Sequence, residues 1–153
     1  GGCRNMQKLG GLTELGQTVK PMLLRRGLAA TISEWLRSAE DIMAAGNPNV
    51  VLCERGSRTS ETDTGNARGL SAGPMLHELS RLPVVVGPSH ATGRARLVTP
   101  VALAATAGGA DGIMVEVHND PIHALCDGAQ SIKPDEYDAL CRDVRTIRKV
   151  AMR

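Results

Sequence analysis

The sequence contains no phenylalanine, and it has only one tryptophan and one tyrosine among its 153 residues. Proteins that bind single-stranded nucleic acid stack the bases on aromatic side chains, so this chain has little with which to make such contacts. Its net charge of +2 is also too small to indicate a polyanionic partner. We therefore expect no nucleic-acid partner.

Long apolar runs and paired cysteines are absent as well. No apolar run approaches the ~20 residues that a helix needs to cross a membrane, and no signal peptide is visible. The cysteines show neither Cys-x-x-Cys spacing nor the pattern of a short disulfide-rich secreted domain, so we expect them to be reduced thiols. We expect a cytoplasmic protein without a membrane partner, and the start at Gly1-Gly2 in place of Met indicates a fragment or a processed chain. The four cysteines are Cys3, Cys53, Cys126 and Cys141.

Strand-like and helix-like segments alternate along the chain, with one unit of strand, loop and helix about every thirty residues. The capping box formed by Thr31 and Glu34 predicts the start of one helix, which Gly46 ends. We expect strands at 19–24, 50–53, 84–86 and 112–118. We expect helices at 8–15, 31–46, 70–82, 98–107 and from Pro134 onward.

This alternation predicts an α/β fold with parallel strands joined by right-handed helical crossovers. A doubly wound sheet and a (β/α) barrel both fit the pattern. No Gly-x-Gly-x-x-Gly follows any of the strands, which argues against a dinucleotide-binding fold. Each strand instead carries a charged or ligand-type residue directly after its last apolar position. Barrel enzymes assemble their active sites from such positions, so we favour the barrel.

Ligand-type residues follow the last two expected strands. Gly87-Pro88 ends the valine run 84–86 and places Ser89-His90 in the loop beyond it. The run 112–118 delivers Glu116 and His118 at its end, and Asp127 follows in a short loop. The carboxyl ends of parallel strands meet at one edge, and His, Glu and Asp side chains that converge there can bind a divalent metal.

Arginines follow the earlier strands. Arg25-Arg26 and Arg55 leave neighbouring strand ends, and Arg4 lies in the loop at the start. Guanidinium groups on one rim can bind phosphate bidentately. Glu54 either orients Arg55 or faces a neighbouring strand, and the polar loop 57–69 is long enough to contact substrate. A phosphorylated small molecule activated by a metal is the substrate class that these residues indicate.

Six short motifs follow one another along the chain: Cys-Arg-Asn-Met-Gln (3–7), Pro-Met-Leu-Leu-Arg-Arg-Gly (21–27), Leu-Cys-Glu-Arg-Gly (52–56), Pro-Ser-His (88–90), Val-Glu-Val-His (115–118) and Asp-Gly-x-Gln-Ser (127–131). In this order they closely resemble the later half of a 3-deoxy-D-arabino-heptulosonate 7-phosphate (DAHP) synthase of the type I/KDSA family. The resemblance covers nearly the whole chain, and six motifs are far more specific than one.

The resemblance implies a (β/α)8 TIM barrel, of which residues 1–153 form a partial domain with about the last four βα units. It implies the condensation of phosphoenolpyruvate with erythrose 4-phosphate, at the entry to the shikimate pathway. A divalent metal (Mn²⁺, Fe²⁺, Zn²⁺ or Co²⁺) would serve as cofactor. Four βα units make only half of a closed barrel and leave unpaired strand edges, so we expect the chain to pair with further copies of itself or with a complementing half-barrel.

The resemblance also implies roles for individual residues. His90, Glu116 and Asp127 match the family's metal ligands, while Arg4 and Arg55 match positions that hold phosphoenolpyruvate. Arg25 stands at an active-site position, so it is expected to bind substrate and, with His90, to act in catalysis.

The sequence departs from the family pattern at three points. The family's metal-binding Cys and its Lys-Pro-Arg motif belong to the earlier half of the barrel, and Cys3 is not that ligand. Arg25 replaces a Lys, which keeps the charge but cannot release a proton near neutral pH. Gly87 replaces an Asp, which removes a carboxylate from the site. These departures point to a truncated or decayed member, or to one part of a split enzyme.

Three hypotheses therefore stay open. In the first, the chain is a catalytic segment that is active only with its missing half. In the second, it is a non-catalytic remnant that binds phosphate ligands or acts as a regulatory subunit of an intact synthase. The third keeps the enzyme class but changes the aldose, as in the 3-deoxy-octulosonate 8-phosphate synthases, which share the Cys-Glu-Arg-Gly and Asp-Gly elements.

Overall fold

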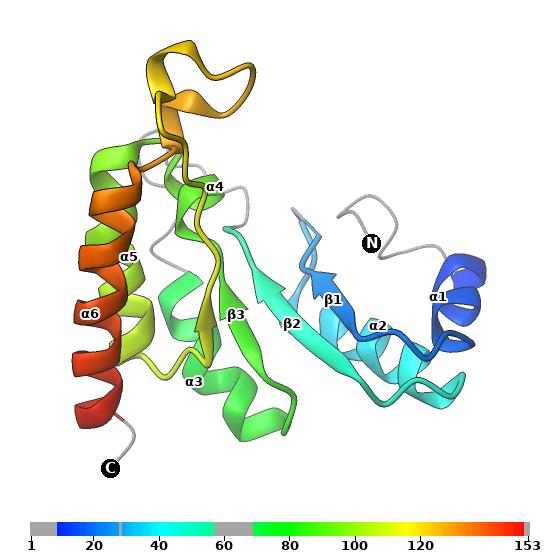
Figure 1. Ribbon diagram of the computed structural model, residues 1–153. Coiled ribbons are helices and arrows are strands. Elements are labelled where there is room, and N and C mark those ends of the chain that lie inside the picture. The colour runs from blue at the N-terminus through cyan, green and yellow to red at the C-terminus, as the bar shows by residue number, and fades with distance from the viewer. Residues whose placement is uncertain (1–8, 28, 57–68, 152–153) are drawn as a thin grey trace.

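The strands form one parallel sheet in this computed structural model, which describes residues 9–27, 29–56 and 69–151 (Figure 1). Each strand pairs with the next along the chain, so the sheet order in the described residues is β1-β2-β3-β4. The expected parallel βα organisation is confirmed. The strands are β1 (Met22–Arg25), β2 (Val50–Glu54), β3 (Val84–Val86) and β4 (Gly112–Ile113).

Helices connect and cover these strands, and the last long helix packs against the one before it. None of the helices in the described part of the chain is both long enough and apolar enough to cross a bilayer. The helices are α1 (Leu9–Gly16), α2 (Ile32–Ala44), α3 (Gly69–Leu79), α4 (Pro88–Thr92), α5 (Ala95–Ala107) and α6 (Pro134–Ala151), with short 3-10 turns η2 (Pro121–His123) and η3 (Gly128–Gln130).

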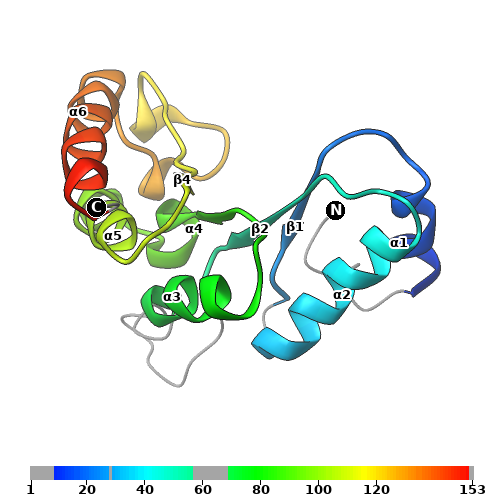
Figure 2. The ribbon, with the colours of Figure 1, turned by 90° about the horizontal axis from the view of Figure 1, so that it is seen from below.

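The strand order distinguishes between the two architectures that the sequence allowed. A doubly wound sheet reverses its strand order part-way and carries helices on both faces. Here the order runs in one direction, and Figure 2 shows α2, α3 and α5 on the same side of the strands. That is the arrangement in part of a (β/α)8 barrel, whose helices form an outer ring. The chain is therefore a partial barrel.

Local sequence explains the start and end of α2. The Thr31 side chain accepts a hydrogen bond from the Glu34 amide, and the Glu34 carboxylate accepts one from the Thr31 amide. The predicted capping box is thus confirmed. Gly46 follows the helix with a φ of 117°, a left-handed conformation that favours glycine.

The core lies between the sheet and the helices. Trp35 on α2 is fully buried, and its indole N–H donates to the Leu24 carbonyl of β1 at 3.2 Å. It packs with Ile42, Leu52 and Val84, which are also fully buried. A second apolar cluster joins α5 and α6 to the segment before α6, and its buried members are Val98, Ala102, Ile132 and Leu140.

Two of the expected strand boundaries are wrong. The first strand begins at Met22 and not at Val19, which is 90% exposed and is separated from the strand by Pro21, a residue without an amide donor. The last strand ends at Ile113 and not at His118. Beyond Met114, whose amide still donates to Val86, the backbone bonds to other partners than β3.

Two further expectations about helices need correction. The third helix ends at Leu79, before the expected end at Leu82, whose amide donates to the Ser80 hydroxyl instead. His90 was expected in a loop, but it lies on the one-turn helix α4. Pro88 occupies the first turn of that helix, where its missing N–H costs nothing.

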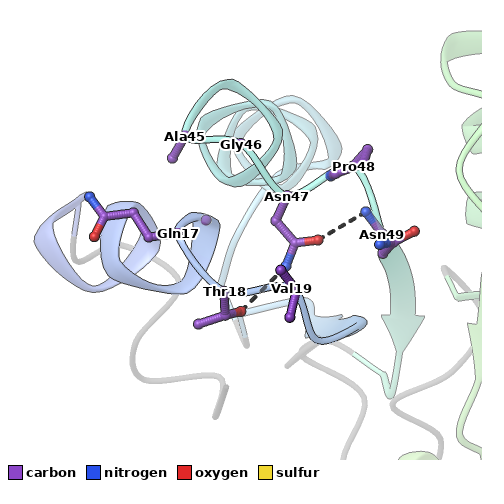
Figure 3. A pocket seen from close by; sticks show the side chains of 9 residues that line it. Gln17, Thr18, Val19, Ala45, Gly46, Asn47, Pro48 and Asn49 are labelled. Atoms are coloured by element: carbon purple, nitrogen blue, oxygen red, sulfur yellow. Dashed lines mark hydrogen bonds between the residues drawn. The ribbon is translucent and has the colours of Figure 1, made fainter.

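A pocket at the amino ends of β1 and β2 lies opposite the edge where sites are expected. It is lined by residues 16–19 and 45–49, and the Asn47 side chain lies at its centre (Figure 3). Asn47 is 1% exposed; its amide nitrogen donates to the Lys20 carbonyl at 2.9 Å and its oxygen accepts from the Asn49 amide at 3.1 Å. These bonds join the two strand entrances, which indicates a structural role for the pocket.

We predict that Asn47→Ala lowers the free energy of unfolding by about 1–3 kcal/mol. The Lys20 carbonyl and the Asn49 amide would both lose their hydrogen bond to the buried Asn47 side chain. Chemical denaturation measures this loss. Gln17→Ala is the matched control, since the Gln17 side chain is exposed and points away from Asn47 in Figure 3. Equal stability of the two variants would contradict the assignment.

Candidate metal centre

His90 is positioned by the turn that follows β3. Pro88 begins α4 immediately after the strand, and Gly93, with a φ of 62°, ends it. The Thr92 hydroxyl donates to the Pro88 carbonyl at 3.0 Å and tightens the same turn. Because the helix is so short, the His90 ring stays at the carboxyl edge of the sheet, with 32% of its side chain exposed.

Glu116 lies in the extended segment beyond β4. Its backbone amide donates to the Ser89 hydroxyl at 3.0 Å, and its carbonyl accepts from the Ile132 amide at 3.0 Å. The segment is therefore tied both to α4 and to the chain that leads into α6. These bonds leave the Glu116 carboxylate half-buried beside His90.

Asp127 occupies a turn with unusual backbone geometry. Its φ of 55° lies in the left-handed region, and among the described non-glycine residues no other has a positive φ. The Ser131 hydroxyl donates to the Asp127 carbonyl at 2.9 Å and closes the turn. Gly128 follows because a Cβ there would lie 2.1 Å from the Pro121 carbonyl oxygen. The expected loop position of Asp127 is confirmed.

The three side chains meet. One ligand atom from each of His90, Glu116 and Asp127 lies within 4.8 Å of those of the other two. His90 Nε2 is 2.7 Å from Glu116 Oε1. Ligand atoms ~2.0–2.2 Å from a common metal lie up to ~4.4 Å apart, so small side-chain adjustments suffice for joint coordination. The structure thus brings together the three residues predicted from the sequence.

The electrostatics of the group favour a cation. Burial raises the pKa of Glu116 above its usual value, and the neighbouring Asp127 carboxyl raises it further, while the Gln130 side chain lowers it. In the described part of the chain, no Lys or Arg forms an ion pair with either carboxylate. Two adjacent carboxylates and an imidazole form a nitrogen and oxygen donor set that fits a divalent transition metal.

The arginines divide into two kinds. Arg26 turns away from the rim: it pairs with Glu54 at 2.7 Å, donates to the Ala30 carbonyl and lies over the Trp35 ring. Its expected place on the cationic rim is therefore wrong, and Glu54 faces the neighbouring strand β1 instead of orienting Arg55. Both groups belong to the packing of α2 on the sheet.

Arg25 and Arg55 remain at the carboxyl edge. Arg25 ends β1, half-buried and in register with Cys53 of β2. Arg55 follows β2, and its Nε atom is buried without a hydrogen-bond partner among the residues described. A buried guanidinium nitrogen without a partner is suited to an anion. Arg4 and the loop 57–69, except for its last residue, lie outside the described residues.

Several polar residues near the group were missed by sequence reasoning. Ser89, Gln130 and Ser131 all contact the ligands or their backbones. Each lies one to four positions from a predicted ligand in the Pro-Ser-His and Asp-Gly-x-Gln-Ser motifs, which could have singled them out. His118 was expected near the site, but its Nδ1 accepts from the Asp120 amide and it is not part of the ligand group.

The sequence of this chain is similar to those of known proteins. The sequence model of the "DAHP synthetase I family" matches residues 2–150. A phospho-2-dehydro-3-deoxyheptonate aldolase of Thermotoga maritima is 45% identical over 95% of this chain and 43% of its own length. A 2-dehydro-3-deoxyphosphooctonate aldolase of Magnetococcus marinus is 32% identical over 87% of this chain and 50% of its own.

Solved structures give the same result. The crystal structure of the Thermotoga maritima DAHP synthase superposes with a TM-score of 0.92 at 44% identity, over 97% of this chain and 44% of that one. A truncated form of the Thermotoga enzyme gives a TM-score of 0.88 at 46% identity, over 98% of this chain and 56% of that one. The chain thus spans about half the length of the relatives it matches.

We predict that Mn²⁺ binds this chain weakly and that its affinity rises with pH above the range in which an ordinary Glu carboxyl titrates. Protons compete with the metal for Glu116, whose pKa is raised by burial, so deprotonation at higher pH frees this ligand. Isothermal titration at several pH values measures the trend. His90→Ala is expected to bind at least about tenfold more weakly, and equal affinity for parent and variant would contradict the site.

Proposed function

Because this chain belongs to the DAHP synthetase I family, we propose that it supplies the later half of a barrel that condenses phosphoenolpyruvate with erythrose 4-phosphate. Residues 1–153 form this partial domain. The observation that carries the proposal is the convergence of His90, Glu116 and Asp127 at the carboxyl edge of a parallel sheet. In barrel enzymes that edge is where the active site is built.

His90, Glu116 and Asp127 would hold the divalent metal. With one imidazole, two carboxylates and no thiolate, this set suits Mn²⁺ or Fe²⁺ and is also compatible with Zn²⁺ or Co²⁺. When bound, such a cation polarises the aldose carbonyl or a water molecule. The protein's contribution is to keep the three side chains together at an edge that substrate can reach.

The arginines would bind the phosphate of phosphoenolpyruvate. Arg55 offers a buried Nε without a partner in the described residues, and Arg25 ends the neighbouring strand, paired with Cys53 two residues before Arg55. Guanidinium groups stabilise the charge that develops on a leaving phosphate. Arg4 would join them, according to the family pattern. As a guanidinium group, Arg25 would act in catalysis as a fixed positive charge and not as a general acid or base.

The octulosonate enzymes remain the second candidate, since one of them is 32% identical to this chain. The heptulosonate reaction is favoured by the 45% identity to the Thermotoga relative and by the Arg-Asn-Met-Gln and Pro-Ser-His-Ala-Thr-Gly-Arg segments. The two reactions differ in the aldose. Heptulosonate formation adds the three carbons of phosphoenolpyruvate to a four-carbon aldose phosphate, and octulosonate formation adds them to a five-carbon one.

The direct test is phosphate release from phosphoenolpyruvate in the presence of Mn²⁺ and either aldose phosphate. The chain is mixed with the earlier half of the Thermotoga maritima barrel, the half that the proposal requires from a partner. Turnover with the four-carbon aldose supports the proposal, whereas turnover only with the five-carbon aldose supports the second candidate. Phosphoenolpyruvate binding without turnover supports a remnant that binds phosphate ligands.

A complementing partner is proposed because the sheet has two free edges in the described residues. β1 pairs only with β2, and β4 only with β3. Strands of this buried type expect neighbours on both sides. Beside β4, an apolar groove formed by Ile113, Val115 and Val144 leaves Tyr137 44% exposed. Another half-barrel, or a second copy of the chain, would cover both edges.

We predict that Arg25→Lys, in the complex with the complementing half-barrel, raises turnover by about tenfold or more, within the range that general acid–base groups contribute. Affinity for phosphoenolpyruvate should change much less, because both side chains keep the positive charge. Steady-state kinetics with varied phosphoenolpyruvate separates the two effects. A variant no faster than the parent would show that Arg25 already does what the site requires.

We also predict that the isolated chain self-associates or populates a loosely packed state, because its sheet edges are unpaired. Sedimentation velocity reports the assembly state, and near-ultraviolet circular dichroism reports packing around Trp35 and Tyr137. Trp35 is fully buried, so a native core gives a fixed aromatic signal. A monomer that melts sharply with such a signal would contradict the prediction.

A further inference from the structure

Two buried hydroxyl groups lie directly beside the candidate metal ligands. Ser89 precedes His90 in the sequence and is fully buried, and Ser131 follows Asp127 by one turn and is 6% exposed. Buried hydroxyl groups are costly unless they are hydrogen-bonded. Each of the two hydroxyl groups is hydrogen-bonded to the backbone of a candidate ligand: Ser89 to Glu116, and Ser131 to Asp127.

We propose that Ser89 and Ser131 are positioning residues of the metal centre, which fix the three ligands relative to one another before a metal binds. This inference rests on the proposed metal site. It assigns no direct contact with metal or substrate to either serine. It predicts that the hydroxyl groups contribute to metal affinity more than to folding.

Ser89 connects two of the three ligands. Its hydroxyl accepts a hydrogen bond from the Glu116 amide at 3.0 Å, and the next residue in the chain is His90. This hydrogen bond links the backbone segments that carry His90 and Glu116, whose side chains are themselves 2.7 Å apart. Without the hydroxyl, the Glu116 amide would lose its partner, and the segment beyond β4 could move away from α4. Partners that orient metal ligands in this way typically change metal affinity by about 10–100-fold.

Ser131 fixes the third ligand. Its hydroxyl donates to the Asp127 carbonyl at 2.9 Å and its amide donates to the Gly128 carbonyl, so Ser131 closes the turn with both its side chain and its backbone. Asp127 is held in a left-handed conformation that is unfavourable without such support. The next residue, Ile132, donates to the Glu116 carbonyl, which ties the Asp127 turn to the segment of the second ligand.

The test measures Mn²⁺ affinity of the full chain by isothermal titration for Ser89→Ala and Ser131→Ala. Ser38→Ala is the matched control, because Ser38 is also buried and its hydroxyl donates to a backbone carbonyl on α2, away from the ligands. We expect the two site variants to bind Mn²⁺ about tenfold or more weakly than the control. Thermal unfolding without metal should shift similarly in all three variants. Ser131→Thr, which keeps the hydroxyl, should recover most of the affinity.

A second readout separates positioning from stability. The electron paramagnetic resonance spectrum of bound Mn²⁺ depends on ligand symmetry, so it should change in the site variants and match the parent in Ser38→Ala. Parent-like affinity and spectra for both site variants would overturn the inference, provided that His90→Ala still weakens binding. If His90→Ala binds Mn²⁺ as the parent does, the metal site itself fails, which distinguishes the two failures. If Ser89→Ala does not fold, the comparison of Ser131→Ala with Ser131→Thr tests the positioning role.

Discussion

The parallel register of the sheet brings the ends of its strands, and the candidate residues that follow them, to one edge. Val86 of β3 pairs with Ile113 of β4, and Glu54 of β2 pairs with Val86, so the strands end at one edge. A residue that follows a strand is thereby carried to the same edge, although its side chain can turn toward a covering helix, as that of Arg26 does toward α2. His90 and Glu116 meet at 2.7 Å for this reason, although they are far apart in the chain. The proposed metal site and the proposed phosphate site both depend on this alignment.

Much of the fold could be predicted from the sequence because its determinants are local. The valine run 84–86, the capping box at Thr31 and the helix that starts at Pro134 each depend on residues a few positions apart. The three ligands were also predictable as candidates, because each follows an apolar run or lies in a glycine turn. The order of the strands followed from the regular βα alternation together with the family resemblance.

The remainder depends on contacts that no local pattern specifies. The chain beyond Met114 leaves the β3–β4 ladder, and the Glu116 amide donates instead to the Ser89 hydroxyl, 27 positions away in the sequence. Arg26 leaves the rim because Glu54 on the adjacent strand and the Trp35 ring hold it. Gly87 lies where a Cβ would approach Arg55 Cγ at 3.1 Å. The resemblance implies an aspartate at this position. Its replacement by glycine therefore changes the surroundings of Arg55, a neighbour that the sequence alone could not reveal.

The central claim is that His90, Glu116 and Asp127 together form one metal centre. Anomalous diffraction at the manganese edge, from crystals of the chain soaked in Mn²⁺, tests it most directly. The account predicts one strong peak at about 2.0–2.3 Å from His90 Nε2 and from carboxylate oxygens of Glu116 and Asp127. Full occupancy elsewhere, for example at His118, Asp120 or His123, with no peak among the three ligands, would contradict it.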